Sequence, residues 1–245
     1  MLEKPSAAWT TETGTVTETA TPQINKRAIN VFEMYAQPKA TQKLLDDASI
    51  DVEAWVAEKV ADKFARMEAT AFINGNGTTQ PKGILQYGAG TGFGKIQQVT
   101  SGAAGVVSVV CADSLIVLFY GLQEAYTRDA TFLMNRATLQ SVRLLKLATT
   151  NQYIWQPSLA AGAPDTLLGI PVAQAADMPI ASANSLSVAL GDFKQAYLIV
   201  DRIGLRTLRD PFTEKPFVKF YTTRRTGGEV SKHEQHGSGR YNHFG

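Results

Sequence analysis

Histidine is the side chain most often used for proton transfer near neutral pH, and this 245-residue chain contains three. His233, His236 and His243 all fall in the polar C-terminal stretch, so the rest of the chain has none. The first two do not have the H-E-x-x-H spacing of a zinc protease, and the single Cys111 excludes a cysteine cluster for zinc. We therefore expect no catalytic residues and no metal site.

The stretch Tyr87–Lys95 is rich in glycine and is the strongest apparent cofactor motif in the chain. A dinucleotide fingerprint needs glycines at i, i+2 and i+5, and Phe93 occupies the last position when the motif starts at Gly88. A phosphate-binding Walker loop ending at Lys95 needs Ser or Thr next, where Ile96 stands. The sequence therefore predicts a flexible connector here and no cofactor.

Charge and hydropathy exclude other classes of protein. The net charge is +2, and residues 201–245 hold nine Lys/Arg against five Asp/Glu, which is too small and dispersed an excess to indicate a nucleic-acid-binding surface. No apolar run reaches the roughly 18 residues of a membrane span. The first residues lack the apolar core of a signal peptide. Hydrophobic residues make up 44% of the chain, which predicts a globular protein without a membrane partner.

A long helix, predicted from about Ser49 to Asn74, organises the chain. Its apolar side chains recur at steps of three and four, so one face should be buried along the whole length, while the charged opposite face meets water or a polar partner. We expect Ser49 or Asp51 to cap the first turn, and Gly75 to end the helix in the left-handed conformation. The members of the apolar face are Val52, Val56, Val60, Phe64, Met67 and Ala71, with Trp55 beside them.

The threonine-rich residues 10–21 favour extended structure but offer almost no apolar face to bury. Isolated hairpins are marginal in water, so a ribbon centred on Gly14 would need a surface outside its own domain; a disordered polar terminus is the alternative. A strand is predicted over Ala28–Gln37, and a short helix over Lys39–Asp47 leads into the long helix.

Helical and strand patterns alternate from about residue 100 to 200, which is typical of an α+β fold. A fully buried strand is expected at Tyr197–Val200. The other predicted elements are a helix from Ala112, a strand at Ala130–Met134, a helix at Thr138–Leu147, strand signals at Thr166–Val172 and a strand from Leu186.

A hairpin is predicted from two segments, residues 203–208 and Phe217–Thr223, which are rich in β-branched and aromatic side chains. Their connection, Asp210–Pro216, contains two prolines, and Phe212 is expected to project from it. Such a loop is a candidate interface, and a plain surface turn is the alternative.

The order and spacing of several segments resemble the major capsid proteins of tailed phages, whose fold is called Hong Kong 97-type. The likeness covers about residues 8–228 and is greatest to the capsid proteins of alphaproteobacterial phages and gene transfer agents. The segments that carry it are Glu33–Ala36, Leu44–Asp47, the helix end Phe72–Gly77, then Pro81–Leu85, Leu168–Val172 and Leu190–Phe193.

The resemblance implies an α+β Hong Kong 97-type capsid fold with a long spine helix, a peripheral domain, an axial domain and an extended E-loop hairpin. We expect a partial E-loop and its return strand at residues 1–37, and the peripheral domain with the spine helix at 38–100. The axial domain would span 101–200, the peripheral hairpin 201–228, and a polar tail 229–245.

The function implied by the resemblance is that of a major capsid protein, not an enzyme, that self-assembles into an icosahedral or related phage-type head around double-stranded DNA. Pentamers and hexamers of the chain would form the shell, with portal and possible scaffolding or decoration proteins as partners. The packaged DNA would be contacted without sequence specificity. Assembly in the bacterial cytoplasm would yield a virion, either a phage head or a gene transfer agent particle.

Two loops supply the interface residues that the resemblance implies: the E-loop laid over a neighbouring subunit, and the hairpin connection around local threefold axes. Some relatives cross-link a loop lysine to a neighbour's asparagine, but threonines and a proline stand near those places, so we expect no covalent cross-link. The predicted interface residues are Thr11, Thr13, Gly14, Thr15 and Thr17, then Asp210, Pro211, Phe212, Glu214 and Lys215.

The sequence departs from the family pattern at both ends. The family's N-terminal arm and the first strand of its E-loop have no counterpart, which indicates a shortened chain. Glu229–Gly245 offers only Val230, Tyr241 and Phe244 where the family has a last apolar strand, which places assembly by this chain alone in question. Two other classes stay open as alternatives: an encapsulin-like cellular compartment with the same fold, and a hydrolase that uses carboxylates alone.

Overall fold

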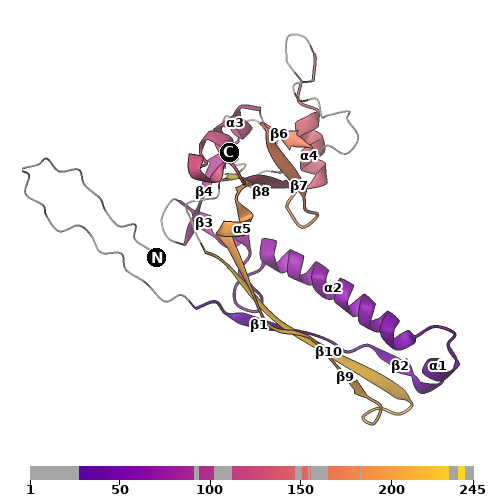
Figure 1. Cartoon of the computed structure of the whole chain (residues 1–245). Helices are drawn as coiled ribbons and strands as arrows, with labels where there is room; N and C mark the ends of the chain where they lie inside the picture. The colour runs from indigo at the N-terminus through magenta and orange to yellow at the C-terminus, as the bar shows by residue number, and fades with distance from the viewer. Residues whose placement is uncertain are drawn as a thin grey trace, which may run out of the picture.

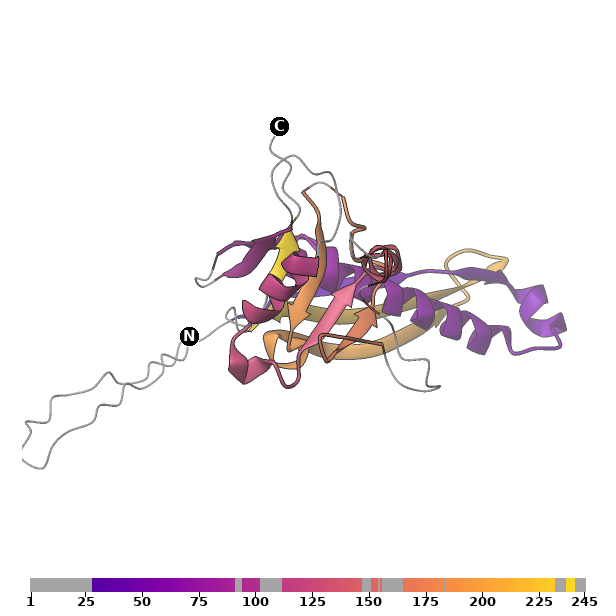
Figure 2. The same cartoon turned by 90° about the horizontal axis from the view of Figure 1, so that it is seen from above.

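The computed structural model describes residues 28–90, 94–101, 112–146, 151–153, 155, 165–182, 184–231 and 237–240, the last group by backbone alone. Two β-sheets divide the described chain into two parts (Figure 1). One part is long and narrow, with a helix lying along a four-stranded sheet. The other is rounder, with a seven-stranded sheet and short helices (Figures 1 and 2). The predicted α+β class is confirmed.

The spine helix is α2, which spans Val52–Asn74 and has 23 residues. Its first turn is capped by Asp51, whose Oδ1 accepts a hydrogen bond from the Ala54 amide at 3.0 Å. Phe64 is buried as expected, but Trp55 and Met67 are 51% and 42% exposed, so the prediction that the whole apolar face is buried is wrong. The sheet beneath the helix is narrow and covers only a central strip. The buried residues of α2 are Val52, Val60, Phe64, Ala71 and Ile73, and Val56 is half-buried.

The end of α2 differs from the prediction for a different reason. Gly75 has φ −61° and ψ 143°, which is an extended conformation and not the left-handed one. The chain folds back here, and the Gly83 amide donates to the Gly75 carbonyl at 2.8 Å. A Cβ at Gly75 would lie 1.9 Å from the carbonyl oxygen of Pro81. Glycine is therefore required by the close approach of two backbones.

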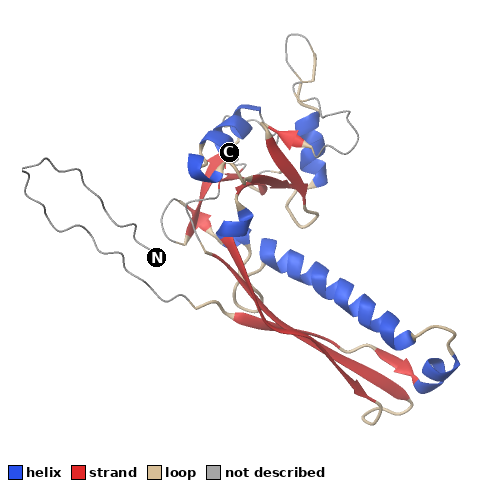
Figure 3. Cartoon of the chain, in the orientation of Figure 1, coloured by secondary structure: helices blue, strands red, loops and turns tan. Residues whose placement is uncertain are grey.

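The long part is built on the hairpin of β9 (Tyr197–Asp210) and β10 (Phe217–Val230), which confirms the predicted pairing (Figure 3). Two short strands, β1 (Val31–Ala36) and β2 (Lys39–Thr41), pair antiparallel with the other edge of β10. Helix α1 (Gln42–Asp47) follows β2. The helix predicted over Lys39–Asp47 is therefore wrong for its first three residues, which β10 recruits into the sheet.

One face of this sheet packs against α2. Val52 of the helix lies in a small buried cluster with Ala40, Val218 and Phe220. The strand at Tyr197–Val200 was expected to be fully buried, but Leu198 and Ile199 are 50% and 53% exposed. This prediction is wrong because a single helix covers only part of the sheet. The long part is thus a two-layer structure with a thin core.

The rounder part contains a sheet with strand order β3-β4-β11-β8-β5-β7-β6. Its strands are β3 (Gly88–Ala89), β4 (Lys95–Thr100), β5 (Thr131–Met134), β6 (Thr166–Leu167), β7 (Ile170–Gln174), β8 (Leu186–Gly191) and β11 (Gly237–Arg240). Its helices are α3 (Ala112–Tyr120), α4 (Arg136–Arg143) and α5 (Phe193–Ala196), with 3₁₀ turns η1 (Ile84–Gln86) and η2 (Glu124–Tyr126).

Three strands of this sheet come from segments where no strand was expected. The glycine-rich stretch, predicted as a connector, contributes Gly88–Ala89 to β3 and leads into β4. The polar tail contributes β11, which lies between β4 and β8. Backbone hydrogen bonds place these residues in the sheet, and hydropathy gives no sign of them.

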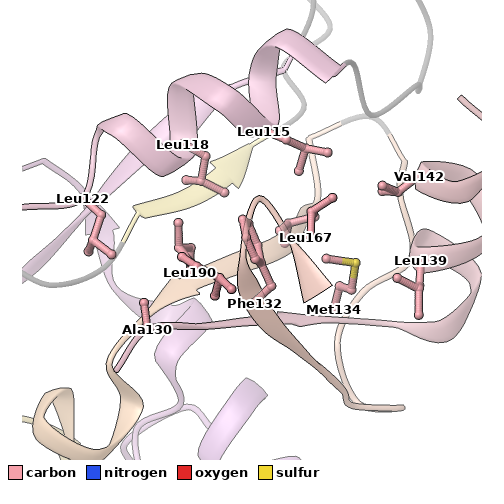
Figure 4. Packing of buried hydrophobic residues seen from close by; sticks show 12 residues of the cluster. Leu115, Leu118, Leu122, Ala130, Phe132, Met134, Leu139, Val142, Leu167 and Leu190 are labelled. Atoms are coloured by element: carbon pink, nitrogen blue, oxygen red, sulfur yellow. The ribbon is translucent and has the colours of Figure 1, made fainter. Parts of the chain in front are cut away.

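The core of the rounder part lies between its sheet and the helices α3 and α4 (Figure 4). Phe132, Met134 and Leu190 from the central strands have no exposed surface. Leu118 of α3 and Val142 of α4 point into the same cluster from its two ends (Figure 4). This is the largest buried cluster of the described chain.

The two parts meet where α2 ends and β9 begins. Tyr197 donates its hydroxyl hydrogen to the Lys82 carbonyl at 3.0 Å, and its ring lies edge-on to Phe72 at 5.7 Å. On the other side of the junction, Thr70 and Asn74 of α2 bond to Asp177 of the rounder part, each at 2.7 Å. Apolar packing adds to these bonds, because Ile73 of α2 lies in a buried cluster with Met178 and Ala189 of the rounder part.

Candidate assembly surfaces

The hairpin tip, residues 210–216, is a compact loop at the far end of the long part (Figure 1). Asp210 organises it: Oδ1 accepts from the amides of Phe212 and Thr213 at 2.9 and 3.2 Å, and Oδ2 accepts from the Thr213 hydroxyl. These hydrogen bonds, chiefly the one from the hydroxyl, lower the pKa of Asp210. The loop is held in one shape by its own side chains.

Phe212 is not part of any buried cluster among the described residues. Its side chain is 81% exposed, the largest exposed fraction of any large hydrophobic residue in the described chain. Pro211 is half-buried beside it, and Lys215 is exposed. An ordered loop that presents a bare aromatic ring is suited to bind another protein surface.

Glu214 ties the tip to the sheet. Its carboxylate lies 2.7 Å from Lys219 and 3.0 Å from Lys39. Hydrogen bonds from Lys219 and then from Lys39 hold the pKa of Glu214 below its usual range. The tip is thus braced on both β10 and β2.

An apolar groove runs beside α2 on the side of β1. It has a volume of about 440 Å³, a floor that includes Ala36 and Val60, and a rim formed by Trp55, Lys59 and Lys63. The tryptophan contributes its exposed ring to the rim. Trp55 therefore lies at the edge of a groove, whereas the exposed Met67 does not line it.

A charged triad joins α2 to the hairpin. Arg224 of β10 lies 3.0 Å from Glu68 of α2 and 3.0 Å from Asp201 of β9. The Glu68 side chain is only 12% exposed. Burial raises the pKa of Glu68, the nearby Arg224 opposes this effect, and Asp201 adds to it. The arginine is the only cation paired with these two carboxylates among the described residues.

The sheet face turned away from α2 is also uncovered. Tyr35, Tyr221 and Leu208 are exposed by 69%, 37% and 64%, and the two tyrosine rings lie 6.5 Å apart. Tyr221 and Leu208 are direct partners across β9 and β10. A neighbouring molecule could cover this aromatic surface without any rearrangement of the sheet.

The predicted site residues fall into three groups, two of interface residues and one of spine-helix residues. Asp210, Pro211, Phe212, Glu214 and Lys215 come together at the hairpin tip. The E-loop residues Thr11, Thr13, Gly14, Thr15 and Thr17 lie outside the described residues. The spine residues Val56, Val60 and Phe64 are at least half-buried, whereas Trp55 and Met67 face outward. Sequence reasoning missed the triad at Glu68, because its three members are far apart in the chain.

No chemistry is evident at these surfaces. Within the residues that the structure describes, no three His, Cys, Asp or Glu side chains gather as metal ligands. No described helix is long and apolar enough to cross a membrane. Exposed apolar side chains on an ordered frame mark surfaces that other protein molecules can bind.

The chain belongs to the phage capsid family, because the sequence profile of that family matches residues 2–235. Two solved structures of gene transfer agent capsids are each 42% identical to it. The capsid of the native particle has a TM-score of 0.87, with 98% of this chain and 82% of that chain covered. The capsid of the empty particle has a TM-score of 0.84, with 97% and 81% covered.

More distant structures share the fold alone. Microbacterium phage Oxtober96 gives a TM-score of 0.72 at 13% identity, with 99% of this chain and 84% of that chain covered. The SrpI encapsulin of Synechococcus elongatus PCC 7942 gives 0.67 at 13%, with 92% and 81% covered. No curated protein matches the chain.

The predicted Hong Kong 97-type fold and the predicted capsid function are confirmed. The chain is a major capsid protein, a structural subunit of a homo-oligomeric shell, and its place is in the virion.

Proposed function

We propose that this chain builds the head of a gene transfer agent or a closely related phage, which assembles in the bacterial cytoplasm and encloses double-stranded DNA. The observation that carries the proposal is the 42% identity to the capsid of a native gene transfer agent particle, over 98% of this chain. An identity of this size over nearly the full chain supports a shared role as well as a shared fold.

The surfaces described above support a mechanism of multivalent assembly. The long part offers three separate surfaces to its neighbours. They are the hairpin tip with Phe212, the groove beside Trp55, and the aromatic face around Tyr35. Each contact is small, but closure of a symmetric lattice makes weak contacts strong together. The E-loop residues Thr11–Thr17 would add an arm that lies over a neighbouring subunit.

The expected partners follow from this mechanism. Pentamers and hexamers of the chain would form the shell, a portal would occupy one vertex, and scaffolding or decoration proteins would bind where the particle uses them. DNA inside would be held without sequence-specific contact. The axial domain would correspond to the rounder part, and the peripheral domain to the long part.

Electron microscopy of particles purified from the producing cells tests the proposal. We expect closed shells that contain this chain and nuclease-protected double-stranded DNA. Shells that hold a folded protein cargo and no DNA would instead identify an encapsulin-type compartment. A chain that is absent from any shell would overturn the proposal.

We also propose that the shell is held by non-covalent contacts alone, because Pro211 stands near the position where some relatives carry the cross-linking asparagine. A denaturing gel of boiled particles should show a single band for this chain. A ladder of covalent multimers would refute this part of the proposal.

A further inference from the structure

Helix α3 is apolar on both of its sides. Leu115 and Leu118 point into the core of the rounder part and are 5% and 2% exposed (Figure 4). The outward stripe at i, i+3, i+4 and i+7 is Asp113, Ile116, Val117 and Tyr120. The last three are exposed by 42%, 56% and 78%. A helix that is apolar all round is normally buried on all sides, so this stripe indicates a partner.

Helix α4 lies at the opposite end of the same sheet (Figure 1). Whereas α3 lies by β4 and β11, Arg143 of α4 pairs with Asp165, next to β6, at 2.7 Å. Its outward stripe is formed by Arg136 and Gln140 and is continued by Leu144, which caps the end of the helix and is 55% exposed. The α3 end of the sheet therefore exposes an apolar stripe, and the α4 end exposes a polar stripe with one apolar side chain, Leu144.

The two ends carry opposite charge. Residues 112–129, which include α3, have Asp113, Glu124 and Asp129 against Arg128. Residues 136–146, which include α4, have Arg136, Arg143 and Lys146; Arg143 is paired with Asp165, and the other two leave this end positive. Within the described chain, neither Asp113 nor Arg136 has an ion-pair partner, so both charges are available to another molecule.

We infer that the α3 stripe of one subunit docks on the α4 stripe of the next copy of this chain. The occupant is a second copy because a single chain supplies both complementary surfaces, and because they lie at opposite ends of one rigid sheet. Such a heterologous contact propagates head to tail and closes into a ring when the rotation per subunit permits. The inference rests on the proposed shell function and names the surfaces that join neighbours within one ring.

The apolar half of the contact is tested by Val117→Asp. The side chain is exposed in the single subunit, so folding measured by circular dichroism should be unchanged. We expect about a tenfold fall in the yield of assembled particles, since a charge would replace an apolar group at the centre of the contact. The matched control is Thr78→Asp, at an exposed position in the turn after α2 and outside both ends of the sheet, which should assemble like the wild type.

The charged half is tested by reversal and rescue. Asp113→Lys alone and Arg136→Glu alone should each reduce the particle yield, and the double variant Asp113→Lys/Arg136→Glu should restore it. The control double variant Asp113→Lys/Lys43→Glu has the same net charge but changes an exposed lysine of α1, outside the assembly surfaces described, so it should not restore assembly. Rescue by both double variants would show that only net charge matters and would overturn the inference.

The experiment separates the two proposals. If the wild type forms no shell, the proposed function fails. If the wild type assembles and Val117→Asp assembles equally well, the α3 contact fails while the shell function stands.

Discussion

The two parts of this molecule use apolar side chains in different ways. In the rounder part, Phe132 and Met134 are completely buried between the sheet and two helices. In the long part, one helix covers one face of a narrow sheet, and Trp55, Leu208 and Phe212 stay at the surface. The first arrangement completes its core within the chain, although the outer side of α3 remains exposed. The second leaves apolar surface that neighbouring subunits in the shell can bury.

The largest effect on folding stability is expected from a substitution in the core of the rounder part. Phe132→Ala should lower the free energy of unfolding by about 3–5 kcal/mol, because it leaves a cavity that rigid neighbours cannot fill. Urea unfolding of the isolated chain measures this change. A loss below about 1 kcal/mol would show that the site can collapse and that the two parts are packed alike.

An intermediate effect on folding stability is expected at the charged triad of the long part, where ion pairs join α2 to the hairpin. Arg224→Met leaves the carboxylates of Glu68 and Asp201 together without their cation, and should cost about 1–3 kcal/mol of folding stability. Because the folded-state pKa of Glu68 is raised, its protonation relieves the repulsion. The deficit should be full at high pH and shrink as the pH falls through that raised pKa.

The control for the triad is the double variant Arg224→Met/Glu68→Gln. It removes one of the two carboxylate charges, so it should recover part of the lost stability and show little of the pH dependence. A double variant that is as unstable as the single one would mean that the arginine acts by packing.

A small effect on stability with a larger one on assembly is expected at the hairpin tip. Phe212→Ala should change the free energy of unfolding by less than about 0.5 kcal/mol, since the ring is exposed. The yield of assembled particles should nevertheless fall, as measured by sedimentation. Normal assembly of this variant would remove the tip from the shell contacts.

The smallest effect concerns the pH dependence of the same loop. The pKa values of Asp210 and Glu214 are both lowered from ordinary values of 3.8 and 4.5. Carboxyls with lowered folded-state pKa values stabilise the loop above those ordinary values and lose this contribution as the pH falls through the lowered ones. Carboxyl NMR titration of the free subunit should show both groups titrating below their ordinary values, and titration at or above them would contradict the hydrogen bonds and ion pairs described.

The sequence predicted what local pattern controls. The periodic apolar residues gave the long helix, Asp51 capped it, and the two β-rich segments formed the hairpin of β9 and β10. The errors arose from tertiary context. Lys39–Thr41 became a strand because β10 offered a free edge, and Gly75 is needed for backbone packing that lies six residues further along the chain.

Burial was the least predictable property. Leu198 and Ile199 form an apolar run typical of a buried strand, and Trp55 lies beside the apolar face of α2, yet all three are exposed in the single subunit. Hydropathy reports that a side chain is apolar and gives no information on whether its own chain or a neighbour covers it. The interface residues could for this reason be suspected from sequence but not separated from core residues.

The central claim is that neighbouring subunits bury the exposed apolar side chains of the long part. Hydroxyl-radical footprinting of free subunits and assembled particles tests it. Trp55, Met67, Tyr35 and Phe212 should be labelled in free subunits and protected in the particle, while the buried Phe132 should be protected in both. If these four exposed side chains are labelled equally in the two states, neighbouring subunits do not cover the long part and the account is wrong.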